Sequence, residues 1–360
     1  MKFSCSVPLQ RIINGTYEYD LYSFLRECQA LEHAGFDSIT AGERRIGPTA
    51  YCPSPHVLAA TALSHTARIR YLSSVVVLPL REPIGLAQDA AVTNAFFPGR
   101  YRLGVGAGYN QHAFHLLGVS LGDRGRLMEE GMTAIRDYFD DQLSVDLGQG
   151  VFPVRDPAMG NLTPEVWGAA WAPGGVERVA RLADGWMPDP MRTLDVVAEL
   201  AGRYREMCAS VNKKPRIALI REAWVADTDE EARETFGPFL AHAHSQYFAR
   251  QKGGWKSDDD ASAGKPYDVK IDPWLAEVNS PDDLKADYLW DRVLVGSVET
   301  VRAGIEEIRD VLDPEELILR FRFQGGPSPV QTLEVIERFG AEIIPHYDPT
   351  APGATPRSAE

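Results

Sequence analysis

The sequence predicts an α/β protein, and within that class a (β/α)8 TIM barrel. Eight segments with the pattern of buried strands recur along the chain with helical segments between them, which is typical of a parallel sheet with crossover helices. A chain of 360 residues, 44% hydrophobic and 24% charged, is long enough for eight such units in one domain. In addition, residues 101–119 (YRLGVGAGYNQHAFHLLGV) join a strand pattern to a glycine-rich polar loop. Ligands of parallel α/β proteins bind at such strand ends.

The individual elements follow from hydrophobic spacing and from turn residues. The predicted strands are residues 2–8, 36–41, 69–80, 101–106, 165–170, 184–188, 216–226 and 316–323. Apolar residues at helical spacing predict helices over 21–31, 128–139 and 301–312. Ser54 and Pro55 are typical of a helix start and predict a further helix that runs to about residue 66.

Two insertions interrupt this alternation, one at 140–163 after the fourth strand and one at 241–290 after the seventh. The second mixes histidines and tryptophans with a charged, glycine-bearing run. A long excursion between strands seven and eight would lie over the catalytic face, so we expect a substrate lid. A surface or subunit-contact excursion is the alternative. We expect residues 1–347 to form a single domain and residues 348–360, rich in Pro, Ala and Gly, to be a disordered tail.

Composition excludes several classes of protein. The net charge of −14 disfavours nucleic-acid binding, which needs clustered Lys and Arg. No apolar run of about 18 residues and no signal-peptide pattern is present, so a soluble, cytoplasmic protein that is not in a membrane is expected. The four cysteines are far apart and lack CxxC spacing, which predicts reduced packing residues without a zinc site or a disulfide framework.

The glycine-rich loop does not carry a dinucleotide fingerprint. Gly104 and Gly106 fit the first two positions of GxGxxG, but Tyr109 stands where the third glycine belongs. Alternating glycines still allow a ligand to approach the backbone closely, because no Cβ intervenes.

Five segments together resemble the bacterial luciferase-like superfamily of flavin-dependent barrel oxidoreductases. They are IRYLSSVVVLPLREPIGLAQDAA (69–91), FFPGRYRLGVGAGYNQHAFHLLGV (96–119), VERVARLADGWMP (176–188), VGSVETVRAGI (295–305) and EVIERFGAEIIPHY (334–347). The resemblance covers nearly the whole chain and keeps the order of the family. It implies a single barrel, a flavin at the C-terminal ends of the strands and a homodimer.

The resemblance also assigns residues to the flavin ring. In this family the third strand carries a bulge with a non-prolyl cis peptide behind the ring, and the matching positions are Ser74 and Val75, next to Ser73. A plain buried strand is the alternative.

The loop after the fourth strand is the second wall of this expected site. Gly106 and Gly108 would let the ring come close, beside Tyr109, and Asn110 is the candidate to hydrogen-bond its pyrimidine edge. Relatives that bind the phosphate tightly sometimes have Arg where this chain has Ala107.

By the same resemblance, the flavin phosphate meets the start of the helix after the fifth strand. Ala172 is expected as the N-cap, and the backbone N–H groups of Gly174, Gly175 and Val176 as the anion site, aided by the helix dipole. Many relatives have Ser at the N-cap, and its replacement by Ala weakens capping by about 1 kcal/mol. A simple helix start is the alternative.

Three residues are candidates for the chemistry: Glu43, Arg44 and His112. Relatives often have Glu-His or Asp-His after the second strand, whereas Arg44 holds the histidine position. Arg is no base near neutral pH, so it would stabilise a peroxide, a reduced-flavin anion or an acidic substrate. The alternative is that Glu43 and either Arg44 or Arg45 are a structural ion pair. His112 is a candidate for catalysis or substrate contact, and we expect no metal, because a third ligand at matched spacing is missing.

The resemblance implies a monooxygenase that uses reduced FMN and O2. A separate flavin reductase would supply the cofactor, and a C4a-peroxyflavin would oxygenate a small organic substrate. A hydride-transferring oxidoreductase that uses the deazaflavin F420 is the first alternative, and a non-catalytic flavin-binding barrel is the second. The sequence does not name the substrate.

Overall fold

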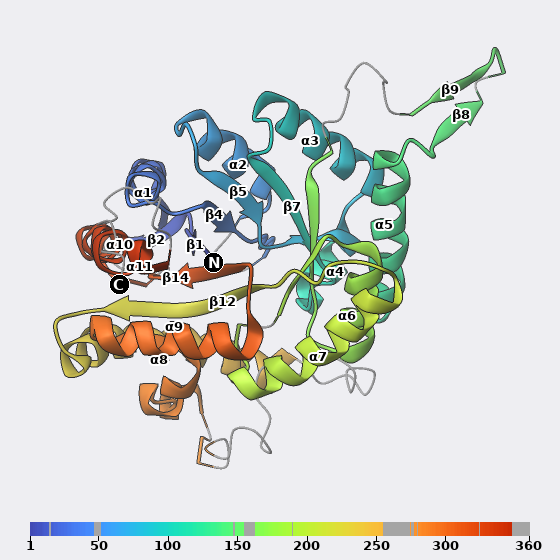
Figure 1. Ribbon diagram of the computed structural model, residues 1–360. Helices are drawn as coiled ribbons and strands as arrows, with labels where there is room; N and C mark the ends of the chain where they lie inside the picture. The colour runs from blue at the N-terminus through green and yellow to red at the C-terminus, as the bar shows by residue number, and fades with distance from the viewer. Residues whose placement is uncertain are drawn as a thin grey trace.

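A curled parallel sheet surrounded by helices forms the body of the protein in a computed structural model of the 360-residue chain (Figure 1). The structure describes residues 1–13, 16–46, 52–146, 148–154, 163–188, 190–254, 274, 277–278, 280–323 and 325–347. The predicted tail at 348–360 lies outside these residues.

The central sheet contains all eight predicted strands. Its members are β1 (Lys2–Ser6), β4 (Ser38–Ala41), β5 (Arg70–Ser73), β6 (Val76–Val77), β7 (Tyr101–Gly106), β10 (Glu165–Ala169), β11 (Gly185–Met187), β12 (Ala218–Val225), β13 (Leu294–Gly296) and β14 (Glu316–Arg320). The order is β11-β10-β7-β5-β4-β1-β14-β12-β13, with β6 also on β7. A parallel bridge from Trp186 to Ile217 joins β11 to the start of β12, so the sheet curls until these strands meet.

Helices surround the curled sheet, most of them on its outside (Figure 1). They are α1 (Leu21–His33), α2 (Pro55–Ser64), α3 (Pro83–Phe96), α4 (Gln111–Leu116), α5 (Arg124–Phe139), α6 (Pro173–Leu182), α7 (Leu194–Ser210), α8 (Asp229–Gly254), α9 (Val298–Leu312), α10 (Pro329–Glu342) and α11 (Ile344–Tyr347). The four predicted helices correspond to α1, α2, α5 and α9. Since strands of such a sheet are covered on both faces, they are continuously apolar, and all six residues of β7 are buried.

The interior of the curled sheet combines an apolar cluster with a polar network. Six side chains form the cluster: Leu72, Trp167, Met187, Ala218, Ile220 and Ile318. Below them, toward the N-terminal ends of the strands, Arg102 on β7 reaches Glu316 on β14 and Ser38 on β4. Neither β14 nor β4 is a sheet neighbour of β7, so these contacts cross the interior.

The first predicted insertion contains an arm. Strands β8 (Ser144–Asp146) and β9 (Val151–Pro153) form an antiparallel hairpin that projects away from the body (Figure 1). Another hairpin, β2 (Gln10–Ile13) with β3 (Thr16–Tyr19), follows β1. Neither hairpin nor β13 was among the predicted strands, because these short strands lie outside the regular alternation of strand and helix patterns on which the prediction rests.

The second predicted insertion begins inside a helix. Residue 241 lies in the middle of α8. The helix begins at the charged residue Asp229 and continues into the aromatic residues that were assigned to the insertion. Residues 255–273 lie outside the described part of the chain, and after them come the short turns η6 (Pro281–Asp283), η7 (Ala286–Tyr288) and η8 (Trp290–Arg292).

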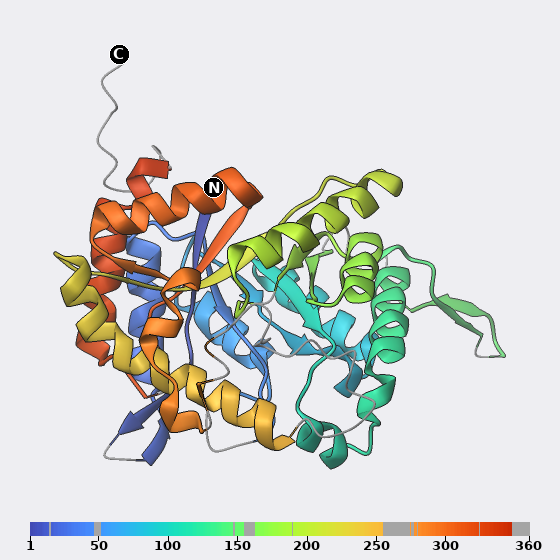
Figure 2. The ribbon, with the colours of Figure 1, turned by 90° about the horizontal axis from the view of Figure 1, so that it is seen from below.

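Helix α8 lies over the ends of β12 and β14. The Phe236 ring is 5.9 Å from the Phe323 ring just after β14, and the Phe239 ring would stand 2.4 Å from a Cβ on Gly326. In Figure 2 the gold helix α8 runs from the left edge toward the middle of the molecule, at the end where the β2–β3 hairpin also lies. This is the end at which β1 finishes, so α8 crosses the C-terminal end of the curled sheet.

Strands β5 and β7 approach each other closely at Gly104. A Cβ at this position would lie 1.8 Å from the backbone oxygen of Ser73, so the strand pair has no room for any other residue there. Ser73 uses its hydroxyl on the same glycine, donating to the Gly104 oxygen (3.1 Å) and accepting from its N–H (2.8 Å).

The cysteines agree with the prediction made from their spacing. All four cysteines are buried with free thiols, as expected for packing residues. Among the described helices, none combines the length and the apolar character that crossing a membrane requires.

Candidate functional site

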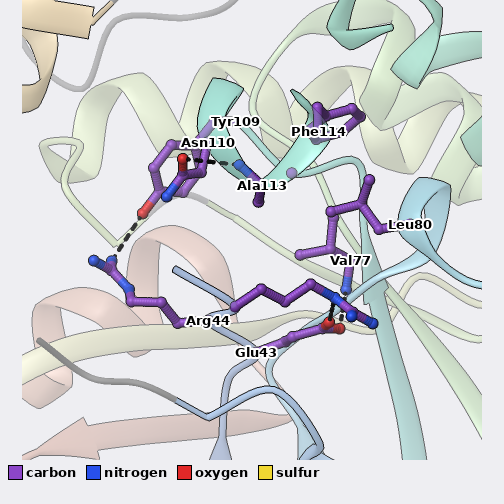
Figure 3. Close-up of a pocket in the computed structure, with 10 residues that line it drawn as sticks. Glu43, Arg44, Val77, Leu80, Tyr109, Asn110, Ala113 and Phe114 are labelled. Carbon is purple, nitrogen blue, oxygen red and sulfur yellow. Dashed lines mark hydrogen bonds and ion pairs between the residues drawn. The ribbon is translucent and has the colours of Figure 1, made fainter. Parts of the chain in front are cut away.

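The ends of β4 and β7 enclose a small cavity of about 50 Å³ (Figure 3). Ten residues line it: Glu43, Arg44, Arg45, Val77, Leu80, Gly108, Tyr109, Asn110, Ala113 and Phe114. Small-molecule sites typically measure 300–1,000 Å³, so this cavity has room for water and not for a three-ring cofactor. It nevertheless brings Glu43 and Arg44 together with Tyr109 and Asn110.

Glu43 is fully engaged in structural contacts. Its buried carboxylate pairs with Arg45 and with Arg81 (3.1 Å), and it accepts a hydrogen bond from the Val77 N–H (2.9 Å). Of the two ion pairs left open by the sequence, the one with Arg45 is therefore present. Arg81, which the sequence analysis missed, is the second partner. The carboxylate holds the turn after β4 against the segment that follows β5.

Arg44 points into the cavity and meets an aromatic pair. Its guanidinium donates to the Tyr109 hydroxyl at 3.2 Å, a contact visible in Figure 3. The Tyr109 ring lies 6.3 Å from the ring of Trp171, just after β10. This row of side chains connects the ends of β4, β7 and β10, and Trp171 is a further residue that the sequence analysis did not single out.

Asn110 and His112 belong to the short helix after β7. The Asn110 side-chain oxygen accepts from the N–H groups of His112 (3.1 Å) and Ala113 (3.4 Å), so this residue is the N-cap of α4. Its carboxamide lines the cavity, but its oxygen is committed to the helix. His112 has an exposed side chain and does not line the cavity.

The residues expected behind the ring lie at the end of β5 and in the short segment between β5 and β6. The Ser74–Val75 peptide is cis, at the position that the resemblance indicated. The Val75 side chain fills the space beside Gly106, where a Cβ would be 2.7 Å from Val75 Cγ2. Gly108 has φ +74°, a conformation that favours glycine. The Val75 side chain therefore explains why a glycine is needed at position 106, and a ligand is not needed to explain it.

The expected phosphate site needs a correction. Helix α6 begins as predicted, with Ala172 as an N-cap that makes no side-chain hydrogen bond. However, the N–H groups of Gly175 and Val176 both donate to the Ala172 oxygen (2.9 and 3.0 Å), because they close the first helical turn. Gly174 alone of the three has no backbone partner among the described residues, and a Cβ there would meet open space.

A second polar cluster, on the β12 side of the barrel end, was missed by the sequence analysis. Arg320, the last residue of β14, donates to Glu222 Oε1 on β12 at 2.9 Å. His244 of α8 is fully buried, with Nε2 3.9 Å from the same oxygen. The pKa of His244 is lowered to about 4, mainly by burial and to a smaller extent by the charges of Arg292 and Arg320, against the opposing effect of Glu222.

The strand pattern contained a signal for this cluster. Residues two apart on a strand face the same side, and Ala218 and Ile220 belong to the interior cluster. Glu222 therefore continues the inward face of β12. A carboxylate on an otherwise apolar inward face is rare unless it is paired or functional.

Comparison with known proteins gives one family. A model described as luciferase-like monooxygenase matches residues 1–313. The oxygenase component of a flavin-dependent trigonelline monooxygenase from Acinetobacter baylyi is 26% identical over 274 residues, which are 73% of this chain and 74% of the relative.

Solved structures share the fold at low sequence identity. The oxygenating constituent of 3,6-diketocamphane monooxygenase from Pseudomonas putida, a type II Baeyer-Villiger monooxygenase in complex with FMN, has a TM-score of 0.73 at 17% identity and covers 96% of this chain and 98% of its own. An F420-dependent secondary alcohol dehydrogenase has a TM-score of 0.66 at 16% identity and covers 99% of both chains. At this identity the likeness concerns the fold.

Proposed function

Because the chain belongs to the luciferase-like monooxygenase family and is therefore an enzyme, we propose that it is the oxygenase of a two-component flavin-dependent monooxygenase. A separate reductase would supply reduced FMN, and the substrate would be a small organic molecule. The relative from Acinetobacter baylyi is named as an oxygenase component, and the diketocamphane monooxygenase carries FMN.

The observation that carries this proposal is the arrangement of residues at the C-terminal ends of β7, β10 and the start of α6. Gly106 pairs with Ala169 across the two strands, and the Val75 side chain packs against Gly106, so this wall presents small apolar side chains against which a planar ring would lie. The exposed start of α6 offers the Gly174 N–H and the helix dipole to a phosphate. These residues fit a flavin phosphate and ring, with a single free N–H of the three expected.

When bound, the flavin would supply the oxygen chemistry, and the chain would supply positioning and charge. Arg44 carries a permanent positive charge at the ends of β4 and β7, held there by Tyr109. It would stabilise a developing negative charge and would not move a proton. Glu43 would act indirectly, because its carboxylate is occupied by Arg45 and Arg81.

An F420-dependent hydride transfer is the second candidate. The fold of the secondary alcohol dehydrogenase in complex with an F420-acetone adduct covers the whole chain at a TM-score of 0.66. Ala107 and Ala172 also offer no side-chain donor to an FMN phosphate, which keeps this cofactor in consideration. The remaining candidate is a barrel that binds a flavin and catalyses neither reaction.

The remaining parts of the proposal concern domain organisation and assembly. Residues 1–347 would form one domain with 241–290 as a lid, of which α8 contributes the part up to Gly254 over the end of the barrel. A homodimer would cover the exposed apolar side chains of Val57 on α2 and of Val92 and Phe96 on α3.

Titration with each cofactor tests the proposal. We expect FMN fluorescence to be quenched on binding, F420 to be bound at least 10-fold more weakly, and reduced FMN in the complex to consume O2 when a substrate is present. Tighter F420 binding would select the second candidate, and no binding of either would contradict both.

A charge placed at the start of α6 tests the phosphate site. Gly174→Asp would put an anion where the phosphate is expected and lower FMN affinity at least 10-fold, while Asp in a first helical turn does not harm the helix. Gly202→Asp, at an open position within α7, is the matched control and should leave FMN affinity unchanged. Equal affinities for the two variants would refute this placement.

A further inference from the structure

One buried carboxylate oxygen at the C-terminal end of the barrel has no use in the described fold. Glu222 is fully buried, and its Oε1 accepts from Arg320. Its Oε2 is buried without a hydrogen-bond partner in the described part of the chain. Buried polar atoms are nearly always hydrogen-bonded, and an exception calls for an explanation such as a missing ligand.

The surroundings of Glu222 suit a ligand better than a structural partner. The contact with His244 is 3.9 Å long, beyond hydrogen-bond range, so displacing the imidazole would not break a hydrogen bond to Glu222. Thr40, on the inward face of β4, also has a buried hydroxyl oxygen without a partner among the described residues. Two unused polar atoms thus lie in the C-terminal half of the same interior.

We infer that Glu222 is the polar anchor for the organic substrate, and that its Oε2 accepts a hydrogen bond from a hydroxyl or N–H group of a neutral molecule. This inference names the substrate class of the proposed monooxygenase and rests on that proposal. Glu222 provides the acceptor, Arg320 fixes it, and the part of α8 that bears His244 closes over the bound molecule.

Charge balance decides in favour of a neutral donor. Arg320 neutralises Glu222 at 2.9 Å, and Arg292, nearby, is itself paired with Asp291 at 2.7 Å. His244 is uncharged near neutral pH because burial lowers its pKa. A cationic substrate would therefore meet no net negative charge, while a hydroxyl would gain a strong charge-assisted hydrogen bond.

Access to Glu222 requires α8 to move. The Oε2 atom is covered in the structure, and α8 is the element that places His244 against the carboxylate. The apolar body of the substrate would lie near Phe323, whose ring is 5.9 Å from the Arg320 guanidinium. Lids that move to admit a substrate are common in enzymes.

Calorimetric titration with phenol, anisole and benzylamine tests the inference at pH 7. Phenol and anisole share a ring and differ in the donor, and benzylamine carries a cationic donor. In the wild-type protein we expect phenol to bind at least 10-fold more tightly than anisole, the worth of one hydrogen bond to a charged group, and more tightly than benzylamine. In Glu222→Gln the phenol preference should fall below about 3-fold, with the anisole affinity unchanged.

Glu27→Gln is the matched control, because Glu27 is also a buried carboxylate paired with an arginine, Arg322, at 2.9 Å. It should keep the phenol preference. Absence of the preference in the wild type, or its retention in Glu222→Gln, would overturn the inference, and so would its equal loss in the control. The titrations are run with and without oxidised FMN. Failure to bind FMN would count against the proposed function, while the flavin-free titration still tests Glu222.

Discussion

Two buried acid–arginine pairs lie inside the curled sheet, near its opposite ends, and they differ in how fully the carboxylate is used. Toward the N-terminal end, Glu316 accepts from Arg102 with both oxygens and also from the Ser4 hydroxyl. Toward the C-terminal end, Glu222 accepts from Arg320 with one oxygen. The strand β14 carries Glu316 as its first residue and Arg320 as its last.

The difference separates a structural pair from one that is available for function. Burial raises the pKa of Glu316, but the charge and hydrogen bonds of Arg102 and the Ser4 hydroxyl outweigh it and lower the pKa below its usual range. A satisfied buried network makes the fold specific. A half-satisfied one costs stability, which is tolerated where a ligand completes it. In barrels of this kind ligands bind at the C-terminal face, where the incomplete pair lies.

The largest expected effect comes from breaking the complete pair. Arg102→Leu would leave the Glu316 charge buried without its partner and lower the free energy of unfolding by about 3–5 kcal/mol. Urea denaturation followed by circular dichroism measures this loss. The double variant Arg102→Leu with Glu316→Leu should recover part of it, since no buried charge remains. A loss below about 1 kcal/mol for the single variant would contradict the structural role.

The second largest effect is expected at acidic pH, which should destabilise the cluster formed by Glu222, Arg320 and His244. The folded-state pKa of His244 is about 4, below the ordinary value of about 6.5. The unfolded chain therefore binds a proton first, and the stability due to neutral His244 is present above pH 6.5 and lost as the pH falls toward 4. His244→Gln should remove up to about 3 kcal/mol of this acid-dependent loss, measured by urea denaturation between pH 7 and 4.

The control for this titration is His65, which lies exposed at the end of α2. His65→Gln should leave the pH dependence of stability as in the wild type. His56 also has a pKa lowered to about 4 by burial, so some acid sensitivity remains in His244→Gln. An unchanged pH profile in His244→Gln would show that His244 is not buried in neutral form.

A smaller effect is expected for the carboxylate of the incomplete pair. Glu222→Gln keeps an oxygen that can accept the hydrogen bond from Arg320. The substitution removes the negative charge and replaces the other carboxylate oxygen, which has no hydrogen-bond partner among the described residues. The free energy of unfolding should therefore change by less than about 1 kcal/mol. Thermal denaturation without ligands measures it. A loss as large as that in Arg102→Leu would mean that Glu222 is as structural as Glu316.

The smallest effects come from a matched pair on β4. Ser38 accepts from Arg102 at 2.7 Å, whereas the Thr40 hydroxyl oxygen, two residues further along, is buried without a partner among the described residues. Ser38→Ala should lower the free energy of unfolding by about 1 kcal/mol and Thr40→Val should raise it by about 0.5 kcal/mol. Chemical denaturation of both variants compares the two ends directly, and effects of equal sign would remove the contrast.

The sequence was sufficient for the barrel strands because each is apolar on both faces and bounded by turn residues. The eight predicted strands and the four predicted helices are all present, whereas it is the structure that brings the turn at Glu43 and Arg44 together with Tyr109 and Asn110. The element β13 was missed, since it lies outside the regular alternation of strand and helix patterns on which the prediction rests.

The contacts of the site were less predictable than its location. Glu43 pairs with Arg81, 38 residues away along the chain, and Glu222 with Arg320 and His244. Such partners depend on which strands become neighbours, and local spacing does not contain that information. Similarly, the number of free N–H groups at α6 depends on how tightly its first turn closes.

The contact between β5 and β7 at Gly104 has a consequence for directed evolution of this protein. Because a Cβ at Gly104 would lie 1.8 Å from a backbone oxygen, a library randomised at this codon should yield glycine alone among folded clones. Variation of substrate range must therefore enter through the segments after the strands and through α8, where side chains have neighbours that can be exchanged. The spacing of these two strands is thus a fixed dimension of the scaffold within which new specificities can be selected.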